Sequence, residues 1–228
     1  MLSVIIPTLN PGDRFSQVLA SVRTELGPLG AEIIVASAGL SKSAIEVCHT
    51  YGAQIIDAPK GRGLQMIEGA KASSQPWLMF LHADSILQKG SGSLAAVFMV
   101  DPLNDGRAGY YRLAYDEDNS GARRIARLAN WRAKTFGLPY GDQAMLISRQ
   151  LYDGVGGFAA LPLMEDVDLV RRLGRHRLVQ MNGIIETSAE RYAQDGYWLR
   201  PIRNLLCLTL YFCRVPNAWL RRLYGGPS

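Results

Sequence analysis

The sequence predicts an α/β fold that begins with a Rossmann-like half built on a mainly parallel sheet. Short runs such as 2–8 (LSVIIPT) and 77–83 (WLMFLHA) are apolar almost throughout, which is typical of strands buried on both faces. Segments with helical spacing of apolar residues separate these runs. Strands that alternate with helices in this way indicate a parallel sheet covered on both faces.

The elements of the first hundred residues follow from these local patterns. In the segment 13–26, Phe15, Val18 and Val22 recur at helical spacing, and Asp13 stands where a helix cap is expected. Strands are predicted at 2–8, 31–37, 53–59 and 77–83, and helices at 13–26, 43–52 and 63–73.

The rest of the chain differs in character but shows no internal repeat and no low-complexity segment. A domain boundary, if present, lies near 100–105, and we expect one continuous domain over residues 1–228. Strands are predicted at 109–115 and 144–148 and helices at 122–136 and 163–176, the former helix carrying Ile125, Leu128, Ala129 and Arg132 along one side.

Composition excludes several classes of protein. With 228 residues, 48% of them hydrophobic and 20% charged, the chain has the composition of a globular protein. Its three cysteines are too few and too scattered for a disulfide framework or a zinc site, which favours a cytoplasmic setting. The first residues lack the pattern of a signal peptide, and the apolar run 205–212 is far shorter than the roughly 20 residues of a membrane span. We therefore expect a soluble protein.

The formal net charge of +5 is unevenly spread, because the residues from Arg171 onward include 10 Lys/Arg and 3 Asp/Glu. Such a basic region suits an anionic partner, either a diphosphate or a membrane surface, and it is equally compatible with a solvated face. No motif of a nucleic-acid reader accompanies the charge, so we expect no nucleic-acid partner.

Polar residues follow the predicted strands at their carboxyl ends, which is where ligands bind in open α/β sheets. Neither a GxGxxG dinucleotide motif nor a Walker phosphate loop is present, which disfavours a dehydrogenase or a P-loop enzyme. The strand ends concerned carry Thr8-Leu9-Asn10, Ser37-Ala38-Gly39, Lys60-Gly61-Arg62 and His82-Ala83-Asp84.

Asp84 is the first candidate for chemistry, because a carboxylate directly after a buried strand needs a partner. Oxygen ligands of this kind hold Mg²⁺ or Mn²⁺ together with substrate phosphates. His82 lies two residues away, on the same side of an extended chain, and is a candidate second ligand if Mn²⁺ is used. The alternative is that Asp84 is an ordinary turn residue.

Glu165 and Asp166 are the second candidates. Adjacent carboxylates at the start of a predicted helix either stabilise its dipole or supply a general base in a cleft. Asp142 and Gln143 stand before a strand in "YGDQAM", where a tight turn is the simpler interpretation. Arg62 and Arg191 are either surface side chains or ligands of a phosphate or base.

Taken in order, these pieces resemble glycosyltransferase family 2, the inverting nucleotide-sugar enzymes of the GT-A fold, and most closely a small bacterial subgroup of soluble single-domain members. The likeness runs from residue 2 to about 192. It rests on LSVIIPTLN as the opening strand, EIIVASAG as the second, LHADS as the Asp-x-Asp metal motif, and GDQAMLISR with GGFAALPLMEDVDLVRRL as the acceptor loop and the pair that carries the catalytic base.

The resemblance implies a metal-dependent transfer of a sugar from a nucleotide-diphosphate donor, with uridine as the expected base, to a hydroxyl acceptor. Residues 1–100 would form the nucleotide-sugar half of a mixed, mainly parallel sheet, and residues 101–228 the acceptor half. Asp166 would be the base, and Glu165 would position either this base or the acceptor. The binding residues implied are Thr8, Asn10, Ser37, Arg62, Asp84 and Arg191 for the nucleotide-sugar, Asp84 with His82 for Mn²⁺ or Mg²⁺, and Gly141, Asp142 and Gln143 for the acceptor.

Two positions depart from the family pattern. The acid that usually follows the second strand and contacts the base is replaced by Ser37, and His82 stands at the first position of the metal motif. The first departure motivates an alternative function, a catalytically silent relative that binds nucleotide or a partner protein. A sugar-phosphate nucleotidylyltransferase is disfavoured, because PTLNPGDRF is a poor match to the phosphate loop such an enzyme needs.

The C-terminal segment 205–225 combines an apolar run with Trp219 and the pair Arg221-Arg222. Such a segment either lies on the inner membrane face beside a lipid-linked acceptor or packs as a helix on the acceptor half, or forms a homodimer contact. We favour packing on the acceptor half or a dimer contact over the membrane surface.

Overall fold

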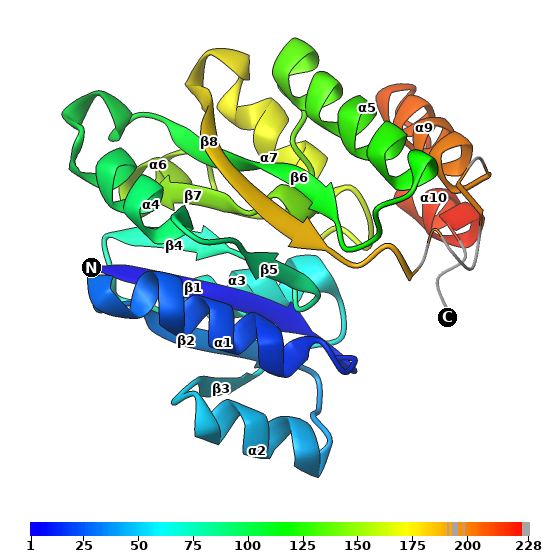
Figure 1. The fold of residues 1–228 in the computed structure, drawn as a ribbon. Coiled ribbons are helices and arrows are strands. Elements are labelled where there is room, and N and C mark those ends of the chain that lie inside the picture. The colour runs from blue at the N-terminus through cyan, green and yellow to red at the C-terminus, as the bar shows by residue number, and fades with distance from the viewer. Residues whose placement is uncertain (191, 193–195, 198, 225–228) are drawn as a thin grey trace.

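The structure is a computed structural model that describes residues 1–190, 192, 196–197 and 199–224. Its described strands form one mixed sheet of eight strands in the order β3-β2-β1-β4-β7-β6-β8-β5 (Figure 1). The strands are β1 (Leu2–Thr8), β2 (Glu32–Ser37), β3 (Gln54–Asp57), β4 (Trp77–Phe80), β5 (Ser85–Leu87), β6 (Ala108–Tyr115), β7 (Met145–Ser148) and β8 (Leu178–Thr187).

The first half of the sheet is parallel, as predicted. β1 pairs with β2 on one side and with β4 on the other, and β3 pairs with β2 at the edge. The register sets Thr8 beside Ser37, and Ser37 beside Asp57. Because parallel strands point the same way, the polar residues that follow them meet at one edge of the sheet.

The second half makes the sheet mixed. β7 runs antiparallel to β4 and to β6, β6 runs parallel to β8, and β8 runs antiparallel to β5. Neither β5 nor β8 was predicted. β5 has only three residues, and Asn182 and Gly183 interrupt the apolar pattern of β8. Gly183 has a packing reason, because a Cβ there would lie 2.8 Å from Leu94 and from Tyr111.

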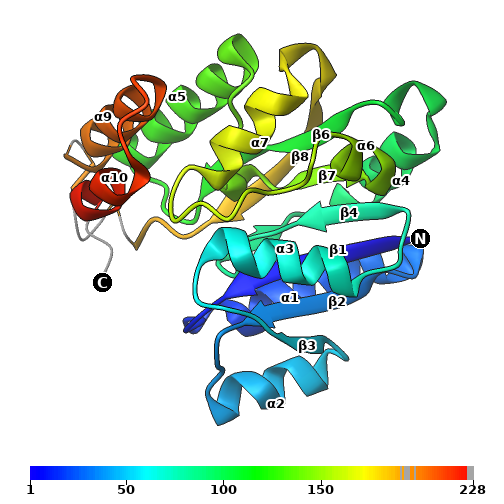
Figure 2. The same cartoon turned by 180° about the vertical axis from the view of Figure 1, so that it is seen from behind.

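Helices cover both faces of the sheet. α1 and α4 lie on one face, and α3, α6 and α7 lie on the other (Figures 1 and 2). The described helices are α1 (Phe15–Leu26), α2 (Lys42–Thr50), α3 (Arg62–Ala72), α4 (Ser91–Val100), α5 (Ser120–Phe136), α6 (Arg149–Gly154), α7 (Glu165–Leu173), α9 (Leu199–Phe212) and α10 (Asn217–Tyr224), with short 3₁₀ helices at Gly27–Leu29, Pro102–Asn104, Gly141–Gln143 and Arg175–Arg177.

The burial of β1 explains why the layers form. Each of its residues is buried, and the side chains alternate between the two faces. Val4 and Ile6 join the cluster beneath α1, whereas Ile5 joins the cluster beneath α3 and α7. The prediction that the apolar run 2–8 forms a strand covered on both faces is therefore confirmed. Asp13, in contrast, does not cap α1, whose N-cap residue is Arg14 without a side-chain cap hydrogen bond.

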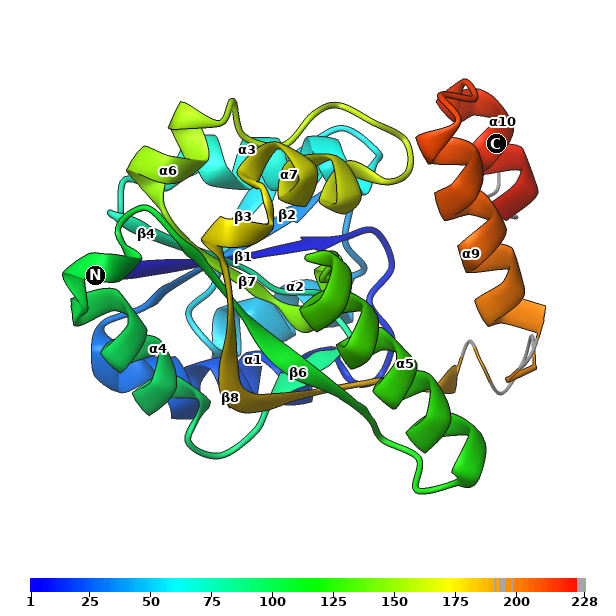
Figure 3. The same cartoon turned by 90° about the horizontal axis from the view of Figure 1, so that it is seen from above.

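The C-terminal helices lie at one end of the molecule, beside α5 (Figure 3). α9 packs through the buried residues Cys207 and Leu208 into the cluster that contains Val170 and Leu173 of α7. Tyr211 of α9 donates a hydrogen bond of 3.3 Å to Asp168 Oδ1. No helix within the described residues is both long and apolar enough to cross a membrane.

Gly92 controls how closely α4 approaches α1. A Cβ at this position would lie 1.8 Å from the backbone oxygen of Glu25, so α4 must retreat if Gly92 is replaced by alanine. We expect Gly92→Ala to lower the free energy of unfolding by about 1–3 kcal/mol, the usual cost of overpacking, in guanidinium denaturation. Gly106→Ala is the control, because no described atom lies within 4 Å of its Cβ. Equal effects of the two substitutions would contradict this account.

Candidate active site

A cavity of about 530 Å³ opens beyond the carboxyl ends of β4, β6 and β8, where the two halves of the chain meet. This volume suits a small-molecule site. Its walls come from α3, the loop after β4, α5, the start of α7 and α9. The sequence-predicted residues that line it are Arg62, His82, Asp84, Gly141, Asp142 and Asp166.

Arg62 reaches the acidic pair from the first turn of α3. Its Nε ion-pairs with Oε1 of Glu165, and its Nη2 lies 3.9 Å from Oδ2 of Asp166. Gly63 makes this approach possible, because a Cβ there would lie 2.9 Å from the backbone oxygen of Ala159. The absence of a side chain at Gly63 lets the loop before α7 pack against α3.

The ion pair between Arg62 and Glu165 joins a buried carboxylate to a partly exposed guanidinium. Glu165 is 1% exposed, and burial raises the pKa of its carboxyl group although Arg62 opposes the rise. Burial alone would lower the pKa of Arg62, but the charges of Glu165 and then Asp166 raise it. Arg62 therefore stays cationic, while 38% of its side chain remains exposed toward solvent and the cavity. The cationic guanidinium of Arg62 is thus held at the cavity wall, where Glu165 compensates its charge in part.

Asp166 is held from two sides in the first turn of α7. Its Oδ2 accepts a hydrogen bond of 2.9 Å from the amide of Gly141, and its Oδ1 accepts one of 2.8 Å from the amide of Val167. Met164, the N-cap residue, has a φ of 64°, a conformation that costs free energy for a residue with a side chain. The carboxylate consequently has a defined orientation in the cavity wall.

Gly141 lies between His82 and Asp166. Its amide holds Asp166, and a Cβ on it would lie 2.5 Å from Nε2 of His82. The same nitrogen of His82 lies 3.4 Å from Nη1 of Arg62. A side chain at position 141 would therefore push apart groups that belong to both halves of the chain.

Gln143 does not reach the cavity. It is fully buried, and its amide nitrogen donates to the backbone oxygen of Tyr111 at 3.1 Å and to Oδ1 of Asn130 at 3.3 Å. Its side chain thus ties the turn 141–143 to β6 and α5. Gly141 and Asp142 remain as the parts of this motif that face the cavity.

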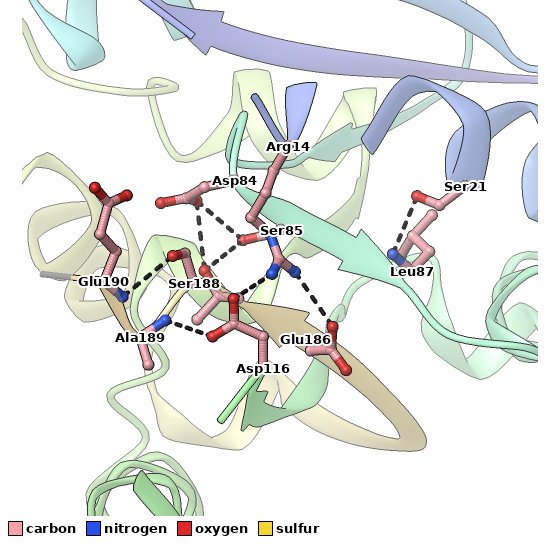
Figure 4. A network of polar contacts seen from close by, with 11 residues as sticks. Arg14, Ser21, Asp84, Ser85, Leu87, Asp116, Glu186, Ser188, Ala189 and Glu190 are labelled. Carbon is pink, nitrogen blue, oxygen red and sulfur yellow. Dashed lines mark hydrogen bonds and ion pairs between the residues drawn. The ribbon is translucent and has the colours of Figure 1, made fainter. Parts of the chain in front are cut away.

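The carboxylate of Asp84 accepts only long hydrogen bonds from the side chains that the structure describes. The hydroxyl groups of Ser85 and Thr187 each donate to its Oδ1 at 3.4 Å, near the long limit for a hydrogen bond (Figure 4). Nearby, Arg14 ion-pairs with Asp116 and with Glu186 and ties the start of α1 to β6 and β8.

The donor set around Asp84 suits a cation that substrate helps to hold. No cluster of three or more His, Cys, Asp or Glu side chains that could bind a metal occurs among the described residues. Asp84 is a hard oxygen ligand with acceptor capacity left, and Mg²⁺-type sites commonly use one or two carboxylates with substrate phosphates. The residues present therefore fit a metal held jointly with a diphosphate and do not form a complete protein cage.

The other predicted nucleotide ligands lie at the same sheet edge but outside the cavity lining. The backbone oxygen of Thr8 accepts a hydrogen bond of 2.7 Å from Gln65, and the hydroxyl of Ser37 donates to Gly39 at 3.1 Å. Asn10 is exposed. Arg191 lies outside the described residues.

Asp57 was not predicted as a site residue. It lies beside Ser37 in the register of β2 and β3, at the same edge of the sheet.

Arg132 lines the cavity and was not predicted as a site residue. Its guanidinium carbon lies 3.4 Å from the ring centroid of Tyr140, and its Nε donates to the backbone oxygen of Leu138 at 3.0 Å. The helical side noted in the sequence, with Ile125, Leu128, Ala129 and Arg132, is the side of α5 that lines the cavity. The helical spacing of these residues was therefore the sequence pattern from which Arg132 could have been assigned to the cavity.

Asp142 is electrostatically unusual. Burial raises the pKa of Asp142 from 3.8 to about 6; Arg132 and Arg62 oppose the rise, and Asp166 and Asp84 add to it. A carboxyl group whose pKa is higher in the native than in the unfolded protein loses native-state stability as the pH rises, here between about 4 and 6.

We expect Asp142→Asn to remove this decrease in the free energy of unfolding with rising pH, because asparagine does not ionise. Above pH 6 the variant should be more stable than wild type by up to about 2–3 kcal/mol, and the difference should vanish near pH 4. Urea denaturation across this pH range, with a chelator present, measures the effect. A pH-independent difference would assign the effect to packing.

Comparisons with solved structures find the same fold in other proteins. The chain resembles TarS of S. aureus (residues 1–349; TM-score 0.66, 14% identity, covering 98% of this chain and 69% of that one). It also resembles a mannosyltransferase from Pyrobaculum calidifontis in complex with GDP-Man and Mn²⁺ (0.64, 11%, 89% and 59%). A third similar structure is glucosyl-3-phosphoglycerate synthase from Mycobacterium tuberculosis with Mn²⁺, UDP and glucosyl-3-phosphoglycerate (0.52, 19%, 82% and 70%). At these identities the likeness establishes the fold, and the predicted GT-A class is confirmed.

A comparison with curated proteins gives no significant match. The model of the family described as Glycosyl transferase family 2 matches residues 3–161, which is most of the chain and includes every cavity residue discussed above up to Asp142. This chain therefore belongs to glycosyl transferase family 2, and the predicted enzyme class, a glycosyltransferase, is confirmed.

Proposed function

We propose that the protein is a metal-dependent inverting glycosyltransferase that moves a sugar from a nucleotide-diphosphate donor, a UDP-sugar, to a hydroxyl acceptor. One observation carries the proposal. Three elements distant in sequence bring Arg62, Asp84 and Asp166 to the wall of a single cavity at the carboxyl edge of the sheet. Family membership adds the reaction class.

On the donor side, charge develops on the departing diphosphate, and positive groups must stabilise it there. Arg62 supplies a permanent positive charge that Glu165 holds in place. Asp84 would hold Mn²⁺ or Mg²⁺, which supplies Lewis-acid neutralisation of the diphosphate when bound. The structures of relatives with Mn²⁺ and GDP-Man or UDP support this assignment. Thr8, Asn10, Ser37 and Arg191 complete the proposed donor contacts.

His82 is the second proposed metal ligand. In the structure its Nε2 contacts Arg62, so its use as a ligand through this atom requires the imidazole to exchange the guanidinium for the cation. Gly141 leaves space beside the ring for such a change, because no Cβ stands in the way.

On the acceptor side, Asp166 is the proposed base. Its carboxylate accepts the proton of the acceptor hydroxyl while that oxygen attacks the anomeric carbon and the nucleoside diphosphate leaves. One base and one displacement invert the anomeric configuration. The hydrogen bonds from Gly141 and Val167 keep the carboxylate oriented for this transfer. Glu165 acts through Arg62 and positions the site.

The alternative is a silent relative that binds nucleotide or a partner protein, and the replacement of the strand-2 acid by Ser37 motivates it. Asp57 weakens that alternative, because its backbone lies beside Ser37 and leaves a carboxylate at the edge where the base of the nucleotide is expected. We therefore include Asp57 among the proposed nucleotide contacts.

Nucleotide binding tests the donor site. UDP with Mn²⁺ should stabilise wild type by about 2.7 kcal/mol at a hundredfold excess over Kd, and GDP, CDP and dTDP should stabilise it less. Asp84→Asn should abolish the Mn²⁺-dependent part in thermal unfolding. Asp118→Asn, at a carboxylate that is 90% exposed, is the control and should behave as wild type. No shift with any nucleotide would favour the silent relative.

Asp166→Asn tests the base. Loss of general-base catalysis should lower kcat for sugar transfer by about 10²–10⁴-fold while the UDP-dependent stabilisation persists. Asp168→Asn is the matched control, since Asp168 shares the first turn of α7 but pairs with Arg172 and lies outside the cavity lining. If both variants kept wild-type turnover, Asp166 would not be the base.

A further inference from the structure

Part of the cavity lining is formed by large apolar side chains. Leu128 on α5 and Ile202 and Leu205 on α9 line it, although each is more than half exposed to solvent. Figures 1 and 3 show α5 and α9 at the same end of the molecule, and both helices contribute to the cavity wall. Large apolar side chains that remain exposed in the lining of the cavity that also contains the proposed base indicate a ligand surface.

Two residues of the same cavity wall each contain an unsatisfied buried atom. Nη2 of Arg132 and Oδ1 of Asp142 are buried and have no hydrogen-bond partner among the described residues. Buried polar atoms normally have partners, because leaving one unpaired costs about 1–3 kcal/mol. One atom is a donor and the other an acceptor, and both belong to residues of the cavity wall.

We propose that this cavity binds an amphipathic acceptor, and the proposal rests on the glycosyltransferase function given above. Nη2 of Arg132 donates to an oxygen of the acceptor head group, and Oδ1 of Asp142 accepts from one of its hydroxyls. The hydroxyl that reacts lies toward Asp166. The apolar body of the acceptor lies between α5 and α9, against Leu128, Ile202 and Leu205.

Two adjacent leucines on α9 distinguish an acceptor in the cavity from a membrane on the outside of the helix. Leu205 and Leu206 are neighbours on α9 and are 63% and 45% exposed, but Leu205 lines the cavity and Leu206 does not. A ligand in the cavity depends on Leu205 alone, whereas a membrane that contacts the exposed side of α9 depends on both. This adjacent pair provides a matched comparison.

The probe is a series of n-alkyl β-D-glucosides, from hexyl to decyl, measured by titration calorimetry below their micelle concentrations. In wild type the affinity should rise with chain length by up to about fourfold per CH₂ group, the full value for burial of a methylene. Leu205→Asn should weaken decyl glucoside binding by about tenfold and flatten the dependence on chain length. Leu206→Asn should match wild type.

Arg132→Gln tests the head-group contact. It should weaken every glucoside by a similar factor of roughly two to ten, the usual range for one hydrogen bond, and should keep the dependence on chain length. Circular dichroism and thermal unfolding of all variants check that they are folded.

Affinity that is independent of chain length, or equal losses in Leu205→Asn and Leu206→Asn, would overturn the proposal. Flotation with phosphatidylcholine vesicles identifies the membrane alternative: binding of wild type to vesicles that both leucine variants lose equally would assign the apolar face to lipid. Stabilisation by UDP with Mn²⁺ is measured on the same samples. If it persists while no glucoside binds, this inference fails and the proposed function stands; if only the glucosides bind, the donor assignment fails.

Discussion

The ion pair between Arg62 and Glu165 is the constraint on which the rest of the site depends. It joins the first turn of α3 to the first turn of α7, which lie 103 residues apart in the chain. Glu165 is almost fully buried, so removing its partner would leave an uncompensated charge in the interior. The two helix starts are thereby held together, and Asp166, the next residue, is placed in the cavity wall.

Backbone close approach completes this arrangement. Gly63 admits the loop before α7, and Gly141 admits the ring of His82 while its amide holds Asp166. These contacts connect the parallel half of the sheet to the half that begins with β6. The proposed chemistry follows from that junction, because positive charge for the diphosphate comes from one half and the proposed base from the other.

The sequence predicted the parallel strands, their helices and six residues of the cavity wall, because buried strands have a strong apolar pattern and their polar ends stand out. β8 was not predicted because Gly183 interrupts its apolar pattern. A side chain at this position would collide with Leu94 and Tyr111. Gln143 was predicted as an acceptor ligand from its place in a motif, but its side-chain amide nitrogen donates hydrogen bonds to the backbone of β6 and to Asn130 of α5.

The sequence by itself determined the fold class, the family and the identity of the acidic and basic residues at the strand and helix ends, because these depend on local periodicity and ordered motifs. Only the tertiary structure decided which of them share a cavity. The ion pair of Arg62 with Glu165 and the apolar wall that α5 and α9 share join segments distant in the chain. The lack of partners for Nη2 of Arg132 and Oδ1 of Asp142 likewise follows from how the folded chain surrounds them. No local pattern encodes them, since burial and hydrogen-bond partners are set by chain segments that meet only after folding.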